Sequence, residues 1–594
     1  ESATSKSFEE IDPKDERLIN NYSLLYACYY KEKRMDEAFD VSLKTMFVIL
    51  NKFDQQNFDL NFNSDYQSIS MYKDQVHSFI FEVLKNSHKN IEIFDKYKDI
   101  RFIDLMFGLQ QVVKSNKLTA KLSESITRQI SKDERVGAEL RKYTSLLEKK
   151  REILKLDTID PDKIKKRNQE ISKLNKELEN LLKDILKKYP DLKKNFANQV
   201  ITGELLHQDM PKDEVVIQYT VGNFHTFATI ITSEDYTVQR ISANKDKLSK
   251  LIKEVRNSLE LKNGKPIEFA LSQSQELHDI LIASFTEIIK NKKKIIIIPD
   301  GPLYSIPFEL LYDKKNQQWL IEKNAISISP SAYSYVALNL EDNLKFNTGN
   351  SFIGFGDPNI KGTKTTELPD FEDILELEFS KVFTRGGNID LKYLKMFPEL
   401  PETADELKRI SKKFDQNSKL YLRDDFNENN INSINFDNYK VVSFASHALV
   451  VGEIDGLSEP SIVLSLPKKI TDDDDGLLTA SEIINLNINS DLVILSACNT
   501  ASSDGNANSE ALSGLANSFF YSGAKSLIVT HWSVISKTSV DLMVDTFDFL
   551  KESEGDLSAA LMKSKIKMLK NPDTNHPIYW APYTLVGRTT SNLR

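Results

Sequence analysis

Cysteine is almost absent from this chain of 594 residues, which contains only Cys28 and Cys498. Two cysteines do not build the disulfide framework of a secreted protein, so we expect a reducing compartment, the cytoplasm. Long apolar runs are absent as well, which argues against a membrane-spanning helix because such a helix needs about 20 apolar residues. No signal-peptide pattern is found, and the sequence begins at Glu1 rather than Met, as a trimmed or processed chain would.

An excess of positive charge is also lacking. The chain has 78 Lys and Arg residues against 87 Asp and Glu residues, a net charge of −9. Nucleic-acid-binding domains are commonly basic, so we expect no direct nucleic-acid partner. Apolar residues make up 40% and charged residues 28% of the chain, as in ordinary globular proteins. The length predicts roughly two to four domains.

The residues around Cys498 predict a strand, a loop, a helix and a second strand. Residues 492–495 are a short run of Leu, Val and Ile, typical of a buried parallel strand. A polar loop follows Cys498, then a helix pattern over about 509–521 and a second apolar strand over 526–530. The thiol therefore follows the carboxyl end of a strand, where open α/β sheets bind their ligands.

A histidine follows an earlier predicted strand in the same way. Residues 441–445 are mostly apolar, and His447 comes two positions later. It precedes Cys498 by roughly 50 positions, the order found in caspase-type cysteine proteases. An imidazole can take the proton of the thiol and later protonate the leaving amine. His531 is a rival general base, and in the simplest alternative Cys498 is only a small buried apolar residue.

Several blocks of the sequence resemble, in order, those of one known family. The blocks are KKIIIIPDGPLYSIPFELL, FIGFGDP, FASHALV, DGLLTASEI, DLVILSACNT, GLANSFFYSGAKSLIVTHWSV and HPIYWAPYTLVG. They resemble the CHAT family, caspase-like peptidases of the clan of separase and the caspases. The resemblance implies a cysteine endopeptidase without a metal or organic cofactor. His447 would be its general base and acid, Cys498 its nucleophile, and the N–H groups of Cys498 and Ala448 its oxyanion hole. The family usually has Gly where Ala448 stands, and a backbone donor survives that change if φ stays negative.

The residue that the enzyme would cut after, P1, is harder to predict. Relatives that cut after Arg or Lys often carry an Asp two positions before the Cys or just after the Trp of the last strand. This chain has Ser496 and Ser533 there, the latter beside Trp532. An unpaired buried charge costs on the order of 3 kcal/mol or more, so the serines weigh against a basic P1 unless Asp504 or Glu510 supplies the charge. Small or apolar residues at P1 are the alternative.

The sequence predicts an α + α/β fold class, in which a helical amino-terminal region precedes a caspase-like α/β domain. Residues 1–130 contain one passable tetratricopeptide-like helix pair, although an irregular helical bundle fits as well. Residues 131–211 carry an apolar stripe between Lys and Glu residues and predict a long helical hairpin and linker, either a partner-docking arm or simply a packed hairpin. The resemblance implies an inactive caspase-like half over 212–360 and an active half over 361–594.

An acidic run and the expected partners complete the prediction. The four aspartates at 472–475 fit either a Ca²⁺ site or a solvated loop before a helix, and they lack the spacing of a defined calcium loop. The resemblance implies a protein substrate, a regulatory partner or signal acting through the helical half, and a role in bacterial defence or cell death. Two alternatives remain, a non-catalytic tetratricopeptide-like adaptor and a protease that acts only on itself.

Overall fold

The computed structural model describes most of the chain after residue 200 and separate helices before it. The described residues are 17–52, 72–86, 102–114, scattered positions within 139–188, 201–262 without 202 and 209, 264–340, 351–361, 397–414, 418–449, 459–467, 474–496, 513–532 and 536–590. They fall into two compact units. The first consists of Glu1–Met210, Ile217–Asp246 and Ser331–Tyr333, and the second consists of Pro211–Val216, Lys247–Pro330 and Ser334–Arg594.

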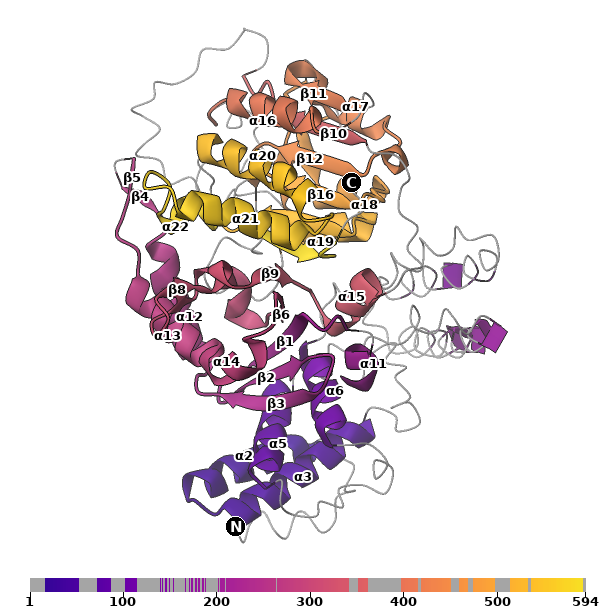
Figure 1. Cartoon of the computed structure of the whole chain (residues 1–594). Helices are drawn as coiled ribbons and strands as arrows, with labels where there is room; N and C mark the ends of the chain where they lie inside the picture. Colours follow the sequence, from indigo (N-terminus) through magenta and orange to yellow (C-terminus); the bar gives the residue numbers. More distant parts are fainter. Residues whose placement is uncertain are drawn as a thin grey trace, which may run out of the picture. The chain divides into compact units, whose positions relative to one another are not determined.

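The first unit joins helices and a β-hairpin in one core (Figure 1). Its helices are α2 (Arg17–Lys31), α3 (Met35–Lys52), α5 (Lys73–Lys85), α6 (Phe102–Lys114) and α11 (Gly203–Gln208), and its hairpin consists of β2 (Thr226–Ile231) and β3 (Tyr236–Ile241). Met46, Phe79 and Leu109 of the helices share one buried cluster with Phe227 and Val238 of the hairpin. The first hairpin after the linker therefore packs with the amino-terminal helices.

The predicted helical hairpin lies largely outside the described residues. Within it, Leu174, Leu178 and Ile185 of the apolar stripe are helical and buried. The tetratricopeptide-like character of residues 1–130 and the domain boundaries stay predictions. Among the helices that the structure describes, none has the length and apolar character that crossing a membrane requires.

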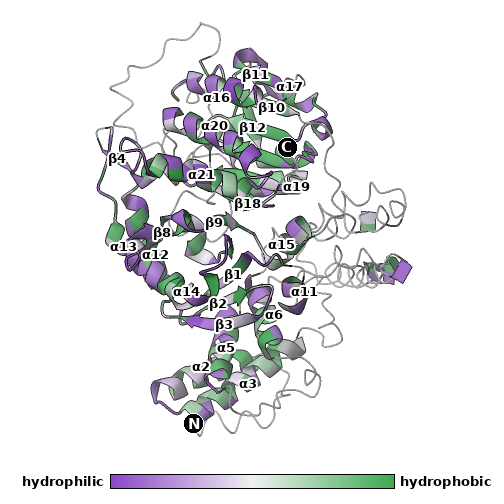
Figure 2. Cartoon of the chain, in the orientation of Figure 1, coloured by the Kyte–Doolittle hydropathy of each residue, from purple (hydrophilic) through white to green (hydrophobic). Residues whose placement is uncertain are grey.

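The second unit is built on a large, mostly parallel sheet. Its strands lie in the order β11 (Lys419–Leu422), β10 (Phe352–Gly356), β12 (Val441–Ala445), β16 (Leu492–Leu495), β17 (Ser526–Thr530), β18 (Tyr583–Gly587), β9 (Ala325–Ile328) and β6 (Lys294–Ile298). Only the pairing of β17 with β18 is antiparallel among these described strands. β10, β12 and β16 are buried along their whole length, and Figure 2 shows the strands as mainly hydrophobic. Short Val, Ile and Leu runs produce such strands because both faces are covered.

Helices cover both faces of this sheet. Phe519 of α19 (Gly514–Ser522) packs against Phe444 on one face, and α16 (Pro401–Ser411) packs with α20 (Ser536–Glu552) on the other.

The remaining long helices are α12 (Lys245–Asn257), α13 (Leu271–Leu281) and α21 (Leu557–Leu569). The short elements are α14 (Thr286–Ile289), α15 (Ala332–Tyr335), α17 (Glu428–Asn432), α18 (Ala480–Asn485), α22 (Pro577–Trp580), the paired strands β4 (Leu261–Lys262) and β5 (Lys265–Pro266), the paired strands β7 (Tyr312–Asp313) and β8 (Gln318–Trp319), and a small sheet of β13 (Ala448–Leu449), β14 (Ser461–Val463) and β15 (Leu477–Thr479). β1 (Glu214–Val221) runs from the second unit into the first. The predicted fold class, a helical region followed by an α/β domain, is confirmed.

Gly587 at the end of β18 is a position where the backbone needs glycine. Its φ is +97°, and a Cβ atom there would lie 2.5 Å from the backbone oxygen of Lys525. We expect Gly587→Ala to lower the free energy of unfolding by about 2–4 kcal/mol, from left-handed strain plus the clash. Gly264→Ala is the matched control, because its φ is +72° but nothing lies within 4 Å. Urea unfolding followed by tryptophan fluorescence measures the stability of both variants. Equal losses of stability would show that the contact with Lys525 makes no contribution.

Candidate active site

The two predicted catalytic positions follow matching points of neighbouring strands. β12 and β16 are parallel, and Phe444 is in register with Leu495. The Ser496 N–H donates to the Phe444 carbonyl at 2.9 Å, which extends the pairing by one residue. His447 and Cys498 each stand three positions beyond the Phe444–Leu495 pair in the sequence. His447 is described, whereas Cys498 lies outside the described residues.

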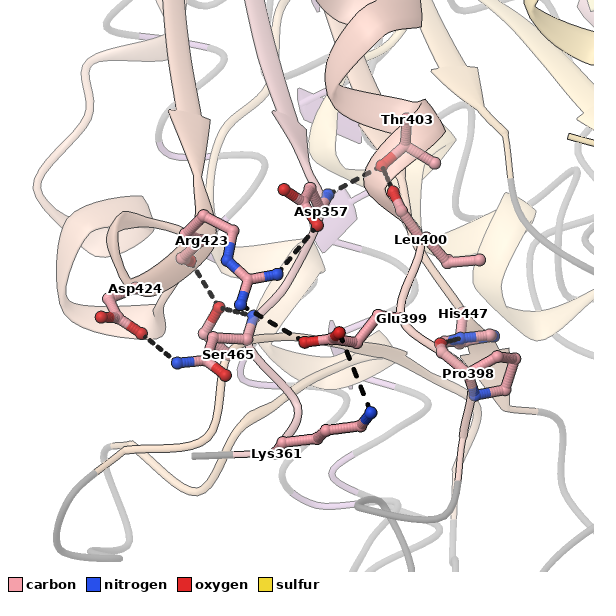
Figure 3. A network of polar contacts seen from close by, with 11 residues as sticks. Asp357, Lys361, Pro398, Glu399, Leu400, Thr403, Arg423, Asp424, His447 and Ser465 are labelled. Atoms are coloured by element: carbon pink, nitrogen blue, oxygen red, sulfur yellow. Dashed lines mark hydrogen bonds and ion pairs between the residues drawn. The ribbon is translucent and has the colours of Figure 1, made fainter. Parts of the chain in front are cut away.

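The ring of His447 is held by one hydrogen bond and one aromatic neighbour. Its Nε2 lies 2.8 Å from the Pro398 carbonyl oxygen, as Figure 3 shows, and its ring centroid is 5.0 Å from that of Phe397. Because a carbonyl only accepts, Nε2 carries the proton of the neutral ring and Nδ1 keeps the lone pair. Burial lowers the pKa of His447, opposed by the Pro398 carbonyl and the charge of Glu402. The net lowering favours the neutral form at neutral pH.

A network of polar contacts fixes the segment that carries the Pro398 carbonyl (Figure 3). Glu399 pairs with Arg423 at 3.3 Å and with Lys361 at 3.8 Å. Arg423 also pairs with Asp357 at 3.1 Å, at the end of β10. This chain of charges connects the residue after Pro398 to the sheet, so the carbonyl that orients His447 is itself positioned.

The small sheet fixes the backbone on the other side of His447. The Val463 N–H donates to the His447 carbonyl at 2.9 Å, and Ala448 stands opposite Ile462. Bonded and non-bonded pairs alternate in an antiparallel ladder, so Ala448 is in a non-bonded pair and its N–H points away from β14. Ala448 is not among the residues with positive φ, so its side chain fits the backbone where the family usually has Gly.

Ser496, two positions before Cys498, lies in a buried polar cluster that sequence reasoning missed. Its Oγ is 2.6 Å from the Tyr583 hydroxyl and donates to Glu406 Oε2 at 3.4 Å. The Tyr583 hydroxyl also bonds to Ser539 of α20. Glu406 comes from α16, where Thr403, Leu407 and Ile410 are buried with it. The helical spacing of Glu406 from Leu407 and Ile410 could have indicated that Glu406 is buried, but no local signal points to its contact with Ser496.

The other predicted residues fall into two groups. Trp532 is buried and its Nε1 donates to the Ile578 carbonyl at 3.1 Å. His531, the rival base, is buried with its Nε2 3.0 Å from Thr584 Oγ1, and burial lowers its pKa well below the usual range. The predicted positions that lie outside the described residues are Cys498, Asp504, Glu510, Ser533, Asp472 and Asp473.

The two described aspartates of the acidic run already have protein partners. Asn429 donates to Asp474 at 2.8 Å, and the Leu477 N–H donates to Asp475 at 2.9 Å. The N–H groups of Asp475 and Gly476 both donate to Glu428, whose pKa burial raises to about 8. In the described part of the chain, no group of three or more His, Cys, Asp or Glu side chains is placed to hold a metal ion. The choice between a Ca²⁺ site and a solvated loop concerns the full run, of which Asp472 and Asp473 lie outside the described residues.

Comparison with known proteins finds one family and distant structural neighbours. The CHAT domain family matches residues 271–588. The separase–securin complex of Saccharomyces cerevisiae is 11% identical with a TM-score of 0.40, and the match covers 99% of this chain and 48% of that one. The Arg-specific cysteine proteinase gingipain R is 8% identical with a TM-score of 0.33, and the match covers 58% of this chain and 74% of that one. The chain therefore spans about half the length of the separase chain, and no curated protein matches it.

Proposed function

The chain belongs to the CHAT domain family, which matches more than half of it, and we propose that it is a cysteine endopeptidase that cuts a protein substrate with His447 and Cys498. One observation carries the proposal. The described parts of β12 and β16 are parallel neighbours in register, and the histidine and the cysteine follow them at equal distances along the sequence. Carboxyl ends of parallel strands meet at one edge of a sheet, so this arrangement favours an encounter of imidazole and thiol.

The proposed reaction uses the lone pair on Nδ1 of His447. This nitrogen can accept a proton because Nε2 donates its own to the Pro398 carbonyl. Nδ1 takes the thiol proton, and the sulfur of Cys498 attacks the carbonyl carbon of the peptide bond. The N–H groups of Ala448 and Cys498 hold the negative oxygen of the tetrahedral intermediate. The imidazolium then protonates the leaving amine, and water hydrolyses the thioester to release the acid and regenerate the thiol. This sequence of steps requires no metal or organic cofactor.

We also propose that the first unit carries the regulatory contact, as part of a cytoplasmic system of bacterial defence. Two of its apolar side chains are strongly exposed, Leu24 at 68% and Phe224 at 70%. Phe224, His225 and Arg240 line a cavity of about 350 Å³ together with residues of α2, α3 and α5. Exposed apolar residues beside a cavity suit a protein partner, which supports regulation through the helical region.

Labelling by a peptide acyloxymethyl ketone, a thiol-reactive probe, tests the endopeptidase proposal. We expect one probe per chain on the wild type and none on Cys498→Ala. Cys28→Ala is the matched control, because Cys28 is an exposed free cysteine and the only other one in the chain. Equal labelling of the wild type and Cys498→Ala would leave the non-catalytic adaptor as the better account. Incubating the labelling-competent chain alone, with fragments followed over time, separates cleavage of itself from cleavage of a partner.

A further inference from the structure

Glu406 is a buried carboxylate with no cationic partner among the residues that the structure describes. Its side chain is 2% exposed, Oε2 accepts from Ser496, and Oε1 has no hydrogen-bond partner among the described residues. Four other buried carboxylates of the second unit are compensated. The pairs are Glu309 with Lys565, Asp491 with Lys525, and Glu214 with Lys294, and Glu428 accepts two backbone N–H groups. An ionised carboxylate in the interior normally needs such a partner, so Glu406 lacks a compensating charge that a bound cation could supply.

The place of Glu406 relative to the candidate nucleophile suits the side chain of a bound substrate. Ser496 contacts Glu406 directly and precedes Cys498 by two positions. Two residues span at most about 7 Å between their Cα atoms, so the nucleophile is tethered within that distance of Ser496. A Lys or Arg at P1 has a side chain of comparable length, because its charge stands at the end of several methylene groups. Such a side chain can therefore place its charge near Ser496 while the peptide bond lies at the nucleophile.

We propose that Glu406 is the specificity-determining residue for P1 and that the enzyme cuts after Arg or Lys, an inference that rests on the proposed endopeptidase function. The carboxylate pairs with the cationic end of the P1 side chain, and Ser496 and the Tyr583 hydroxyl surround that end. The acid comes from α16 rather than from the strand of the nucleophile. Ser496 therefore hydrogen-bonds to an acidic side chain, whereas relatives that cut after Arg or Lys often have an Asp at this position.

The surroundings of Glu406 define how this preference responds to pH. Burial raises the pKa of Glu406 to about 7, opposed by the Ser496 hydroxyl. The titratable groups nearby are Tyr583 on β18, which shares Ser496 with Glu406 as a hydrogen-bond partner, and Glu402, which stands one turn earlier on α16. Glu402 in turn acts on the charge of His447. The charged residues that face α16 from α20 are Asp541 and Asp548, which pair with Arg409 and Lys413. Glu406 ionises as the pH rises, so the preference for a cation is present above about pH 7 and is lost as the pH falls through it.

Paired peptides that differ only in P1, arginine against its neutral isostere citrulline, test the inference. We expect the wild type to favour arginine in kcat/KM by at least about 30-fold at pH 8, as for a buried charge pair. Glu406→Gln should bring the arginine-to-citrulline ratio close to 1. Asp405→Asn is the control on the same helix, because Asp405 is exposed and its pair with Arg409 is 3.9 Å long. It should keep the wild-type ratio.

Two further measurements keep the test independent of folding. The arginine-to-citrulline ratio of the wild type should rise between pH 6 and 8, since titration of the His447–Cys498 pair cancels in the ratio. Glu406→Asp keeps the charge and should keep a preference for arginine. A flat ratio, or a preference that survives Glu406→Gln, overturns the inference alone. Absence of both labelling and cleavage in the wild type removes the proposed function and this inference with it.

Discussion

Replacing His447 with Gln is expected to lower kcat/KM by roughly 10²–10⁴-fold, the usual contribution of a general acid–base. Glutamine can neither accept the thiol proton nor return it to the leaving amine. The wild-type rate should fall on the acid side below pH 6.5, because burial holds the pKa of His447 under its ordinary value of 6.5. Hydrolysis of the citrulline peptide measured against pH checks both the magnitude and the position of this limb, because the charge of Glu406 does not affect a neutral P1.

His576 supplies a matched control for this variant. Its Nε2 also faces a backbone carbonyl, that of Ile267 at 2.9 Å, and burial also lowers its pKa against the effect of that carbonyl. His576→Gln should therefore change kcat/KM by no more than about 3-fold, since it removes a similar histidine that has no part in the proposed proton transfer. Comparable losses in the two variants would mean that the effect of His447→Gln is structural.

Replacing Lys565 with Met should destabilise the second unit by about 3–5 kcal/mol, the range for breaking a buried ion pair. Lys565 and Glu309 are 0% and 1% exposed, and their charged atoms are 2.7 Å apart. Without the ammonium group, Glu309 stays in the interior with its charge uncompensated. Lys565 Nζ also bonds to the backbone oxygen of Tyr583, so the start of β18 loses a donor as well. Urea unfolding followed by tryptophan fluorescence measures the loss.

Lys563→Met on the same helix is the control, because Lys563 is exposed and its pair with Glu552 is 3.6 Å long. Its effect should stay below about 1 kcal/mol. The double variant Lys565→Met with Glu309→Leu removes both charges and should recover most of the stability lost by Lys565→Met. If the double variant is less stable than Lys565→Met alone, the loss does not come from an unpaired Glu309.

The strands that position the site were predictable because their signals are local. Residues 441–445, 492–495 and 526–530 are short apolar runs, and each is a buried strand with the predicted bounds. A strand buried on both faces must consist of such residues, so the composition alone indicates it. The strand order was not predictable, since β18 lies between β17 and β9 through contacts that no local pattern encodes.

The supporting groups around the predicted dyad were missed for a related reason. The group that orients His447 is the carbonyl of Pro398, and a main-chain atom has no signature in the sequence. Glu406 meets Ser496 across 90 positions, so only the fold brings them together. Side chains with distinctive chemistry can be found from sequence, whereas backbone partners and distant neighbours appear only with the structure.

The placement of β18 has a consequence for the order of events during synthesis. β9 and β17 both leave the ribosome before β18, and both pair with it. Until then each presents an open edge on the side that β18 later fills, which exposes the nascent chain to aggregation. Tyr583, whose hydroxyl meets Ser496, arrives with the same strand. A nascent chain therefore possesses its histidine and its cysteine before Tyr583 and the strand that carries it have been synthesised.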